Sequence, residues 1–260
     1  MSKKLIAFIL FLSFLMLFAA CGEKEIPPPP KPAQADPVQE PLPDPVPDRA
    51  KEWPFAGADE TLAELATDLT AKNYFLIFDG SGSMAESGCS GRRRKIDVAK
   101  EAVAEWSKSV PSDANLGVFA FYNNKAAVLP LSSGPRDQFI RAVNSVQASG
   151  RTPLTQAADY AFKELTGQAR RQLGYGEYTI VVVTDGIANS AAKLAEYVGE
   201  ILRTSPVNIY SIGFCIGETH SLNQPGKTTY KAADNPAQLR EGLKEVLAES
   251  EIFDETDFSN

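Results

Sequence analysis

The sequence predicts an α/β protein with a doubly wound, mostly parallel sheet, one antiparallel edge strand, and helices on both faces. From about residue 73 onward, apolar runs with the length of strands alternate with apolar residues at helical spacing. The runs at 74–78 and 178–183 are almost continuously apolar, as expected for strands covered on both faces. Polar residues directly follow both runs, at the sheet edge where such folds bind their ligands.

Hydrophobic spacing defines the expected elements along the chain. Strands are expected over 73–79, 116–122, 126–131, 178–184, 207–214 and, as a short piece, 228–232. Helices are expected over 60–71, 96–110, 135–146, 153–165, 194–201 and 235–246. Asn123 and Asn124 between two of the strands predict the turn of a hairpin. Asn235, followed by Pro236 and Gln238, is typical of a capped helix start.

Oxygen-bearing side chains cluster at the ends of these strands. The first strand is followed by Asp79-Gly80-Ser81-Gly82-Ser83, in which the glycines allow the two hydroxyls to converge on one point. Thr152 lies in a second loop just before a predicted helix, and Asp185 follows the strand at 178–184. A carboxylate with convergent hydroxyls suits a hard cation such as Mg²⁺.

These three motifs resemble the von Willebrand factor A domain family over roughly residues 70 to 250. The metal-ion-dependent adhesion site of that family uses Asp-x-Ser-x-Ser, a threonine in a second loop and an aspartate in a third. The matching residues are Asp79, Ser81, Ser83, Thr152 and Asp185. The resemblance implies bound Mg²⁺ (or Mn²⁺ or Ca²⁺), with an Asp or Glu of a protein partner at the open coordination position.

Enzymatic alternatives fit the same residues less well. Residues 80–85 satisfy a Gly-x-Gly-x-x-Ala dinucleotide pattern, but Asp79 would repel a pyrophosphate, and residues 86–94 separate the glycines from the next helix. No Gly-x-Ser-x-Gly elbow is present. A serine triad would need His220, the one histidine, which is expected to be a solvated loop residue. The site is therefore predicted to bind a ligand and not to catalyse a reaction.

The amino terminus has the pattern of an export signal. Lys3 and Lys4 precede the apolar run 5–20, which is shorter than the ~20 residues of a membrane-spanning helix. Ala19-Ala20-Cys21 resembles the bacterial lipobox, in which Cys21 becomes the lipidated first residue; ordinary signal cleavage and an uncleaved anchor are the alternatives. With Gly22 following, the expected location is the cell envelope, at the outer membrane in a double-membrane bacterium.

Composition divides the remaining chain into a spacer, a domain and a tail. Residues 27–54 hold eleven of the eighteen prolines, so 21–58 are predicted to be a semi-rigid lipidated linker. The domain is expected over 59–250, with an acidic tail at 251–260. Without residues 1–20 the chain has 24 basic and 33 acidic side chains, which disfavours nucleic acid as a partner.

Two further features lie near the predicted site. Cys89 and Cys215 are an even pair, for which an exported chain permits one disulfide; free thiols and an intermolecular bond remain open. Arg92, Arg93, Arg94 and Lys95 form a dense basic run where a helix begins, although the helix dipole disfavours positive charge there. A solvated loop and a surface that steers an acidic partner segment toward the metal are both compatible with this run.

The predicted function is divalent-cation-dependent protein binding from a membrane tether. An envelope scaffold, in which the metal only stabilises three loops, is the structural alternative. A third hypothesis is an accessory subunit of an enzyme complex. Sensitivity of partner binding to a chelator separates the first hypothesis from the second.

Overall fold

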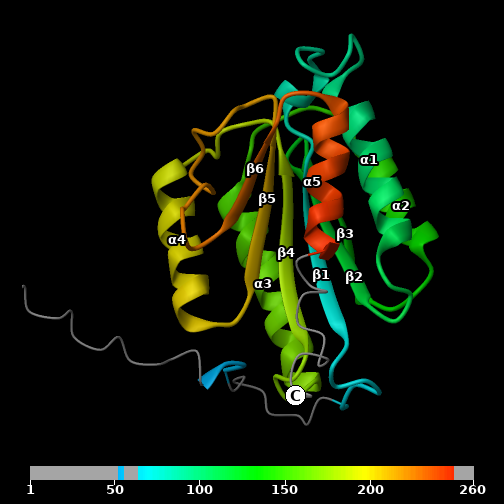
Figure 1. The fold of residues 1–260 in the computed structure, drawn as a ribbon, viewed down its shortest axis with the longest axis vertical. Helices are drawn as coiled ribbons and strands as arrows, with labels where there is room; N and C mark the ends of the chain where they lie inside the picture. Colours follow the sequence, from blue (N-terminus) through cyan, green and yellow to red (C-terminus); the bar gives the residue numbers. More distant parts are fainter. Residues whose placement is uncertain (1–51, 56–63, 249–260) are drawn as a thin grey trace, which may run out of the picture. The chain divides into compact units, whose positions relative to one another are not determined.

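A computed structural model describes residues 52–55 and 64–248, all within the compact unit Pro45–Asn260. Its centre is a six-stranded sheet in the order β3-β2-β1-β4-β5-β6 (Figure 1). All neighbouring strands are parallel except the edge pair β2–β3. The strands are β1 (Lys72–Asp79), β2 (Asn115–Tyr122), β3 (Lys125–Ser132), β4 (Glu177–Thr184), β5 (Asn208–Phe214) and β6 (Thr229–Ala233).

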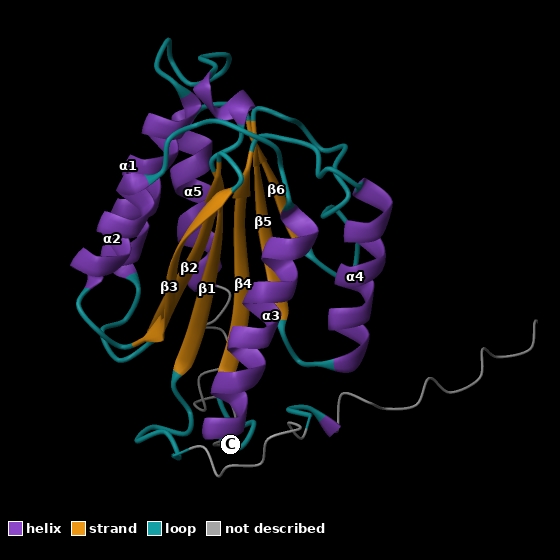
Figure 2. Ribbon diagram, turned by 180° about the vertical axis from the view of Figure 1, so that it is seen from behind, coloured by secondary structure: helices purple, strands orange, loops and turns teal. Residues whose placement is uncertain are grey.

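Helices cover both faces of the sheet, as Figures 1 and 2 show from opposite sides. One face carries α1 (Lys95–Ser109), α2 (Arg136–Ser145) and α5 (Pro236–Ala248). The other carries α3 (Leu154–Arg171) and α4 (Ala191–Thr204). The predicted fold class is confirmed: a doubly wound, mostly parallel sheet with one antiparallel edge strand.

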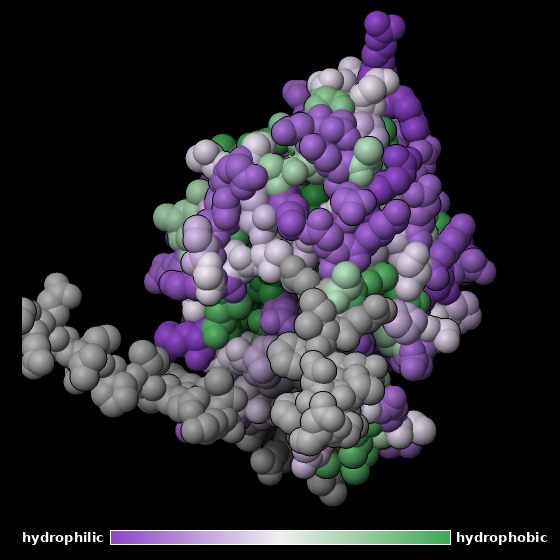
Figure 3. All heavy atoms as spheres, in the orientation of Figure 1, coloured by the Kyte–Doolittle hydropathy of each residue, from purple (hydrophilic) through white to green (hydrophobic). Residues whose placement is uncertain are grey.

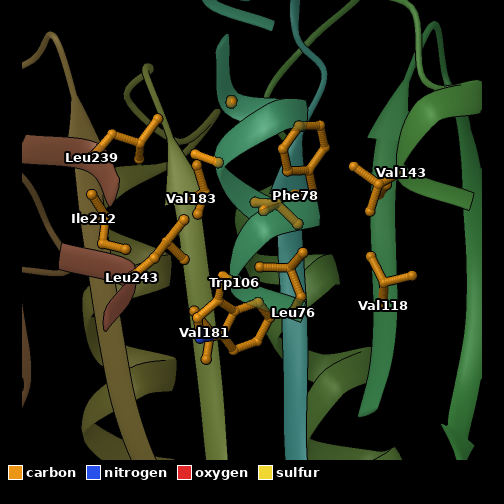
Figure 4. Packing of buried hydrophobic residues seen from close by; sticks show 14 of the residues in the cluster. Leu76, Phe78, Trp106, Val118, Val143, Val181, Val183, Ile212, Leu239 and Leu243 are labelled. Carbon is orange, nitrogen blue, oxygen red and sulfur yellow. The ribbon is translucent and has the colours of Figure 1, made fainter. Parts of the chain in front are cut away.

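Alternation along β1 explains why its run is apolar at every position. Leu76 and Phe78 face the layer of α1, α2 and α5, where they join Trp106 in one core (Figure 4). Phe75 and Ile77 point the other way, into the core beneath α3 and α4. All four β1 side chains are at most 1% exposed. Because successive residues of a strand face opposite sides, a central strand needs apolar residues throughout.

The predicted turns and caps form as their sequences indicate. Asn123 and Asn124 take positive φ values of 43° and 56° between β2 and β3, as a tight hairpin turn requires. Asn235 Oδ1 accepts hydrogen bonds of 3.0 Å from the backbone amides of Ala237 and Gln238 at the start of α5. These amides have no partner within the helix, so the side chain stabilises the first turn.

The helix predicted over 60–71 is wrong for the residues that the structure describes, since none of 64–71 is helical. Leu65, one of the residues that suggested the helix, is 55% exposed. Asp68 Oδ1 instead accepts hydrogen bonds of 2.8 Å from the amide and the hydroxyl of Thr70, a local turn that competes with a helix. Residues 60–63 lie outside the described part.

Trp53 packs into the domain although it lies in the segment predicted to be a linker. Its ring meets Tyr178 edge-on at a centroid distance of 4.8 Å, and its indole nitrogen donates to Thr166 Oγ1 at 3.2 Å. The predicted signal peptide, Cys21, most of the linker and the acidic tail lie outside the described residues. Within 52–55 and 64–248, no helix is long and apolar enough to cross a membrane.

Candidate metal centre

All five predicted ligands lie at the carboxyl edge of the sheet, in three loops. Asp79 ends β1, and Ser81 and Ser83 lie in the following turn with its short 3₁₀ helix η2 (Gly82–Ala85). Thr152 precedes α3, and Asp185 follows β4. Since β1 and β4 are parallel neighbours, their ends meet at one edge. The chain leaves β1 and β4 in opposite directions along the sheet, which is where open α/β folds form ligand crevices.

Two glycines allow these loops to pack closely. A Cβ atom at Gly80 would lie 2.6 Å from the carbonyl oxygen of Phe121, and one at Gly150 would lie 2.9 Å from the nitrogen of Asn123. Gly150 also takes a φ of 87°, which favours glycine. Through this close approach, the Gly80 amide donates to Phe121 O at 2.9 Å and the Gly82 amide to Gly150 O at 3.1 Å.

The side-chain oxygens converge from all three loops. Ser81 Oγ is 3.1 Å from Ser83 Oγ, and Ser83 Oγ donates to Asp185 Oδ1 at 2.7 Å. A Cβ atom placed on Gly186 would lie 3.4 Å from both Ser83 Oγ and Thr152 Oγ1, and 3.9 Å from Asp79 Oδ2. Oxygens of residues far apart in the sequence therefore surround one small space.

Asp79 is the most deeply buried member of this group, with no exposed surface. Its Oδ1 accepts from the Ser81 amide at 2.7 Å, and its Oδ2 accepts from the Thr184 hydroxyl at 2.5 Å. Burial raises the pKa of Asp79 to about 6, although both hydrogen bonds act in the opposite direction. When ionised, Asp79 is thus a buried negative charge whose hydrogen-bond donors are neutral.

Lys95 enters the centre from the first turn of α1, which the sequence did not indicate. Its Nζ lies 2.8 Å from Asp185 Oδ2 and 3.3 Å from Glu86 Oε2, and its side chain is only 7% exposed. Burial lowers the pKa of Lys95, but hydrogen bonds and charges of Asp185 and Glu86 outweigh burial and raise it. Lys95 is therefore not a solvent-facing steering residue, and including it in the steering surface is wrong.

The other members of the basic run lie on the surface. Arg93 forms a bidentate pair with Glu101, and Arg94 forms one with Asp97. Arg92, with a φ of 65°, makes no ion pair with any described residue. It lies in the loop that projects above the sheet edge between η2 and α1 (Figure 1). The charges of Arg93 and Arg94 are therefore largely neutralised by ion pairs within the chain.

His220, expected to be a solvated residue, is in fact 8% exposed and supports the third loop. The Leu222 amide donates to His220 Nδ1 at 3.1 Å, so Nε2 carries the proton and donates to Gly186 O at 3.1 Å. Burial lowers the pKa of His220, which favours this neutral form. Both ring nitrogens form hydrogen bonds with the backbone, and one of them holds the backbone beside Asp185 in place. The loop sequence around it held no periodic signal that could have revealed this contact.

The structure joins Cys89 and Cys215 by a disulfide, with their Cα atoms 5.7 Å apart. Cys215 follows β5, which lies two positions from β1 in the sheet. The bridge fastens the loop before α1, which carries Cys89, to the end of β5. This loop reaches the sheet beside the candidate centre.

A hollow of about 340 Å³ lies beside Thr152, where the hairpin turn meets the second loop. Its lining includes two cations, Lys125 and Arg151, together with aromatic and amide side chains, and no acidic residue. Asn189 connects the hollow to the centre, because its Oδ1 accepts from the Thr152 amide at 3.1 Å. The upper part of the face in Figure 3, toward the carboxyl edge of the sheet, is mostly hydrophilic.

The chemistry of the centre suits a small, hard cation. Mg²⁺ binds six oxygens at about 2.0–2.1 Å, which places adjacent ligand oxygens roughly 2.9 Å apart. The separation of 3.1 Å between Ser81 Oγ and Ser83 Oγ is close to this spacing. The described residues contain no group of three or more His, Cys, Asp or Glu placed to hold a metal. The candidate set is instead rich in hydroxyls, with two carboxylates.

Known proteins resemble this chain in sequence over the region that carries the centre. Residues 74–187 match the family model of the von Willebrand factor type A domain. YwmD, an uncharacterized protein of Bacillus subtilis (strain 168), is 29% identical over 170 residues, covering 58% of this chain and 73% of that protein. Residues 74–187 are thus similar in sequence to a von Willebrand factor type A domain, and the fold is that of such domains. Such domains are generally non-catalytic binding modules.

Solved structures share the fold at low sequence identity. A von Willebrand factor type A protein from Catenulispora acidiphila has a TM-score of 0.54 and 20% identity over 70% of this chain and 43% of its own. The PilB minor pilin of Streptococcus sanguinis has a TM-score of 0.56 and 14% identity, over 72% of this chain and 63% of its own. Proximal thread matrix protein 1 of the mussel byssus, whose structure has a zinc-occupied MIDAS motif, has a TM-score of 0.54 and 18% identity, over 71% of this chain and 48% of its own. The chain thus spans less than two thirds of the length of each of these three proteins.

Proposed function

We propose that this domain binds a protein partner through a divalent cation held by Asp79, Ser81, Ser83, Thr152 and Asp185. The observation that carries the proposal is the convergence of these oxygens from three loops on one small space. A bound Mg²⁺, Mn²⁺ or Ca²⁺ would supply an open coordination position for an Asp or Glu of the partner. His220, the one histidine of the chain, is occupied on both nitrogens, which disfavours acid–base catalysis at this centre.

Binding to the partner is expected to require both the cation and Thr152. The partner is first captured from envelope extract with Mg²⁺ present, and its binding is then measured by surface plasmon resonance. Chelation should abolish binding, and Thr152→Ala should increase the dissociation rate at least tenfold, because it removes a ligand hydroxyl. Thr166→Ala, which removes a threonine hydroxyl on α3 far from the centre, is the matched control. Affinity that is unchanged by chelator would favour the scaffold hypothesis instead.

The hollow beside Thr152 supports an acidic partner segment. Its two cations, Lys125 and Arg151, carry no ion pair to a described residue and lie beside the second loop of the centre. An acidic segment that reached the centre across this hollow would meet both charges. Surface charges of this kind mainly raise the association rate, and their effect falls over a Debye length of ~8 Å at physiological salt.

Arg151→Ser is expected to slow partner association severalfold at low salt, with little change in dissociation. Arg92→Ser removes the same charge from the projecting loop and should change association less. The two variants are compared by surface plasmon resonance at two salt concentrations. If Arg92→Ser has the larger effect, the basic run that begins at Arg92 steers the partner, as its sequence first suggested.

The proposed module acts from a membrane tether. The lipobox-like Ala19-Ala20-Cys21 supports lipid attachment at Cys21, and the proline-rich segment that follows would separate the domain from the membrane. Labelling of cells with a palmitate analogue should mark the wild-type protein and leave Cys21→Ser unmarked. Equal labelling of the two proteins would show that Cys21 is not lipidated.

A further inference from the structure

Lys95 places a positive charge inside the candidate metal centre. Residues at the start of a helix are unfavourable sites for cations, yet this lysine is the first residue of α1 and is 5% exposed. Its ammonium lies 2.8 Å from Asp185 Oδ2. The Lys95 amide also donates to Glu86 O at 2.8 Å, which closes the loop between η2 and α1.

The ammonium and a divalent cation would bind the same carboxylate. Asp185 Oδ1 faces the hydroxyl of Ser83, while Oδ2 faces Lys95. A cation held by Ser83 and Asp185 would therefore lie within a few ångströms of the ammonium, in a buried region where water screens charge poorly. The two positive charges repel each other, so each weakens binding of the other.

We infer that Lys95 is an internal counter-ion that occupies Asp185 in the cation-free state and lowers the affinity of the centre for divalent cations. The inference rests on the proposed function, because it assigns a role at the same centre. When the cation binds, the ammonium turns from Asp185 toward Glu86. The side chain of Glu86 is 70% exposed and already 3.3 Å from Lys95 Nζ, so it offers a carboxylate at the solvent side.

This arrangement makes the centre a switch between two cations. Without metal, Lys95 neutralises Asp185 and keeps the third loop in place. With metal, the freed ammonium changes its contacts with the loop that carries Glu86 and Cys89. That loop projects above the sheet edge at which the centre lies (Figure 1), so a change in its contacts would be accessible to a partner.

Lys95→Met tests the inference, because methionine retains an unbranched apolar side chain without the charge. The variant is expected to bind Mg²⁺ at least tenfold more tightly than wild type by isothermal titration calorimetry. In chelator it should melt at a lower temperature than wild type, because Asp185 loses its buried partner. Lys95→Gln can still donate a hydrogen bond to Asp185 and should also raise the Mg²⁺ affinity. It serves as the test if the methionine variant folds poorly.

Lys100→Met is the matched control on the same helix. Lys100 Nζ donates to the backbone carbonyls of Asn144 and Val146 and contacts no carboxylate of the centre. Its Mg²⁺ affinity should equal that of wild type. If wild type binds Mg²⁺ and both Lys95 variants bind it equally or more weakly, Lys95 only positions Asp185 and the inference is overturned. If neither wild type nor any variant binds Mg²⁺, Mn²⁺ or Ca²⁺, the proposed function fails as well.

Discussion

Asp79→Asn is expected to abolish Mg²⁺ binding and to raise the melting temperature of the metal-free protein. The substitution removes the charge of a carboxylate that has no exposed surface. The amide can still accept from the Ser81 backbone and bond to the Thr184 hydroxyl, so the local hydrogen bonds are retained. Loss of function and gain of stability should therefore occur together, as expected where a charge is kept for binding and not for folding.

The expected gain follows from the sign of the pKa shift. Burial raises the pKa of Asp79 from 3.8 to about 6, so the ionised carboxylate destabilises the folded state at neutral pH. Two pKa units correspond to about 3 kcal/mol at most, or roughly 5–10 °C for a domain of this size. Repulsion from Asp185 also raises this pKa and is the smallest of the causes.

Calorimetric titration with Mg²⁺ and thermal melting in chelator measure both halves of this prediction. Asp113→Asn is a matched control, because Asp113 is exposed and precedes β2, at the opposite edge of the sheet. That variant should bind Mg²⁺ like wild type and melt within a degree or two of it. Undiminished Mg²⁺ binding by Asp79→Asn would contradict the assignment of Asp79 to the centre.

The fold could be predicted because local patterns and tertiary structure agree along most of the chain. The central residues of β1 and β4 are almost all apolar, since both faces of these strands are covered. Asn123 and Asn124 fix a tight turn through their own backbone preferences. The candidate ligands share one edge because the strands that carry them are parallel, which the α/β alternation implied. That β1 and β4 are neighbours is seen only in the fold. Leu65 and Leu69 misled because spacing alone does not provide a surface to pack against.

The contacts that support the centre could not be predicted, because each depends on residues that only the fold brings together. Lys95 reaches Asp185 across a separation of 90 residues, and His220 reaches Gly186 across 34. Neither residue follows a period or a motif. The basic residues at a helix start were the one local anomaly. They indicated a surface role, whereas the side chain of Lys95 is buried. Trp53 likewise packs on Tyr178 from a proline-rich segment with no strand or helix pattern.

Breaking the bridge between Cys89 and Cys215 is expected to cause the largest loss of stability among the changes considered. The two cysteines are separated by 126 residues, and the chain-entropy model assigns about 5 kcal/mol to a closed loop of this length. For a domain of this size, that loss corresponds to a fall in melting temperature of roughly 10–20 °C. The double variant Cys89→Ser/Cys215→Ser avoids the unpaired thiol that either single variant would leave.

Thermal melting of the oxidised protein with and without a reductant measures this loss, and the double variant supplies the control. A reductant should lower the melting temperature of wild type to near that of the double variant and leave the variant itself unchanged. Loss of the bridge should change the Mg²⁺ affinity little while it lowers the melting temperature, because the bridge holds the loop before α1 and contributes no ligand oxygen. Two free thiols at Cys89 and Cys215 in the unfolded, non-reduced protein would refute the bridge. Equal melting of wild type with and without reductant, once thiol titration confirms that the reductant has opened the bridge, would contradict the expected stabilisation.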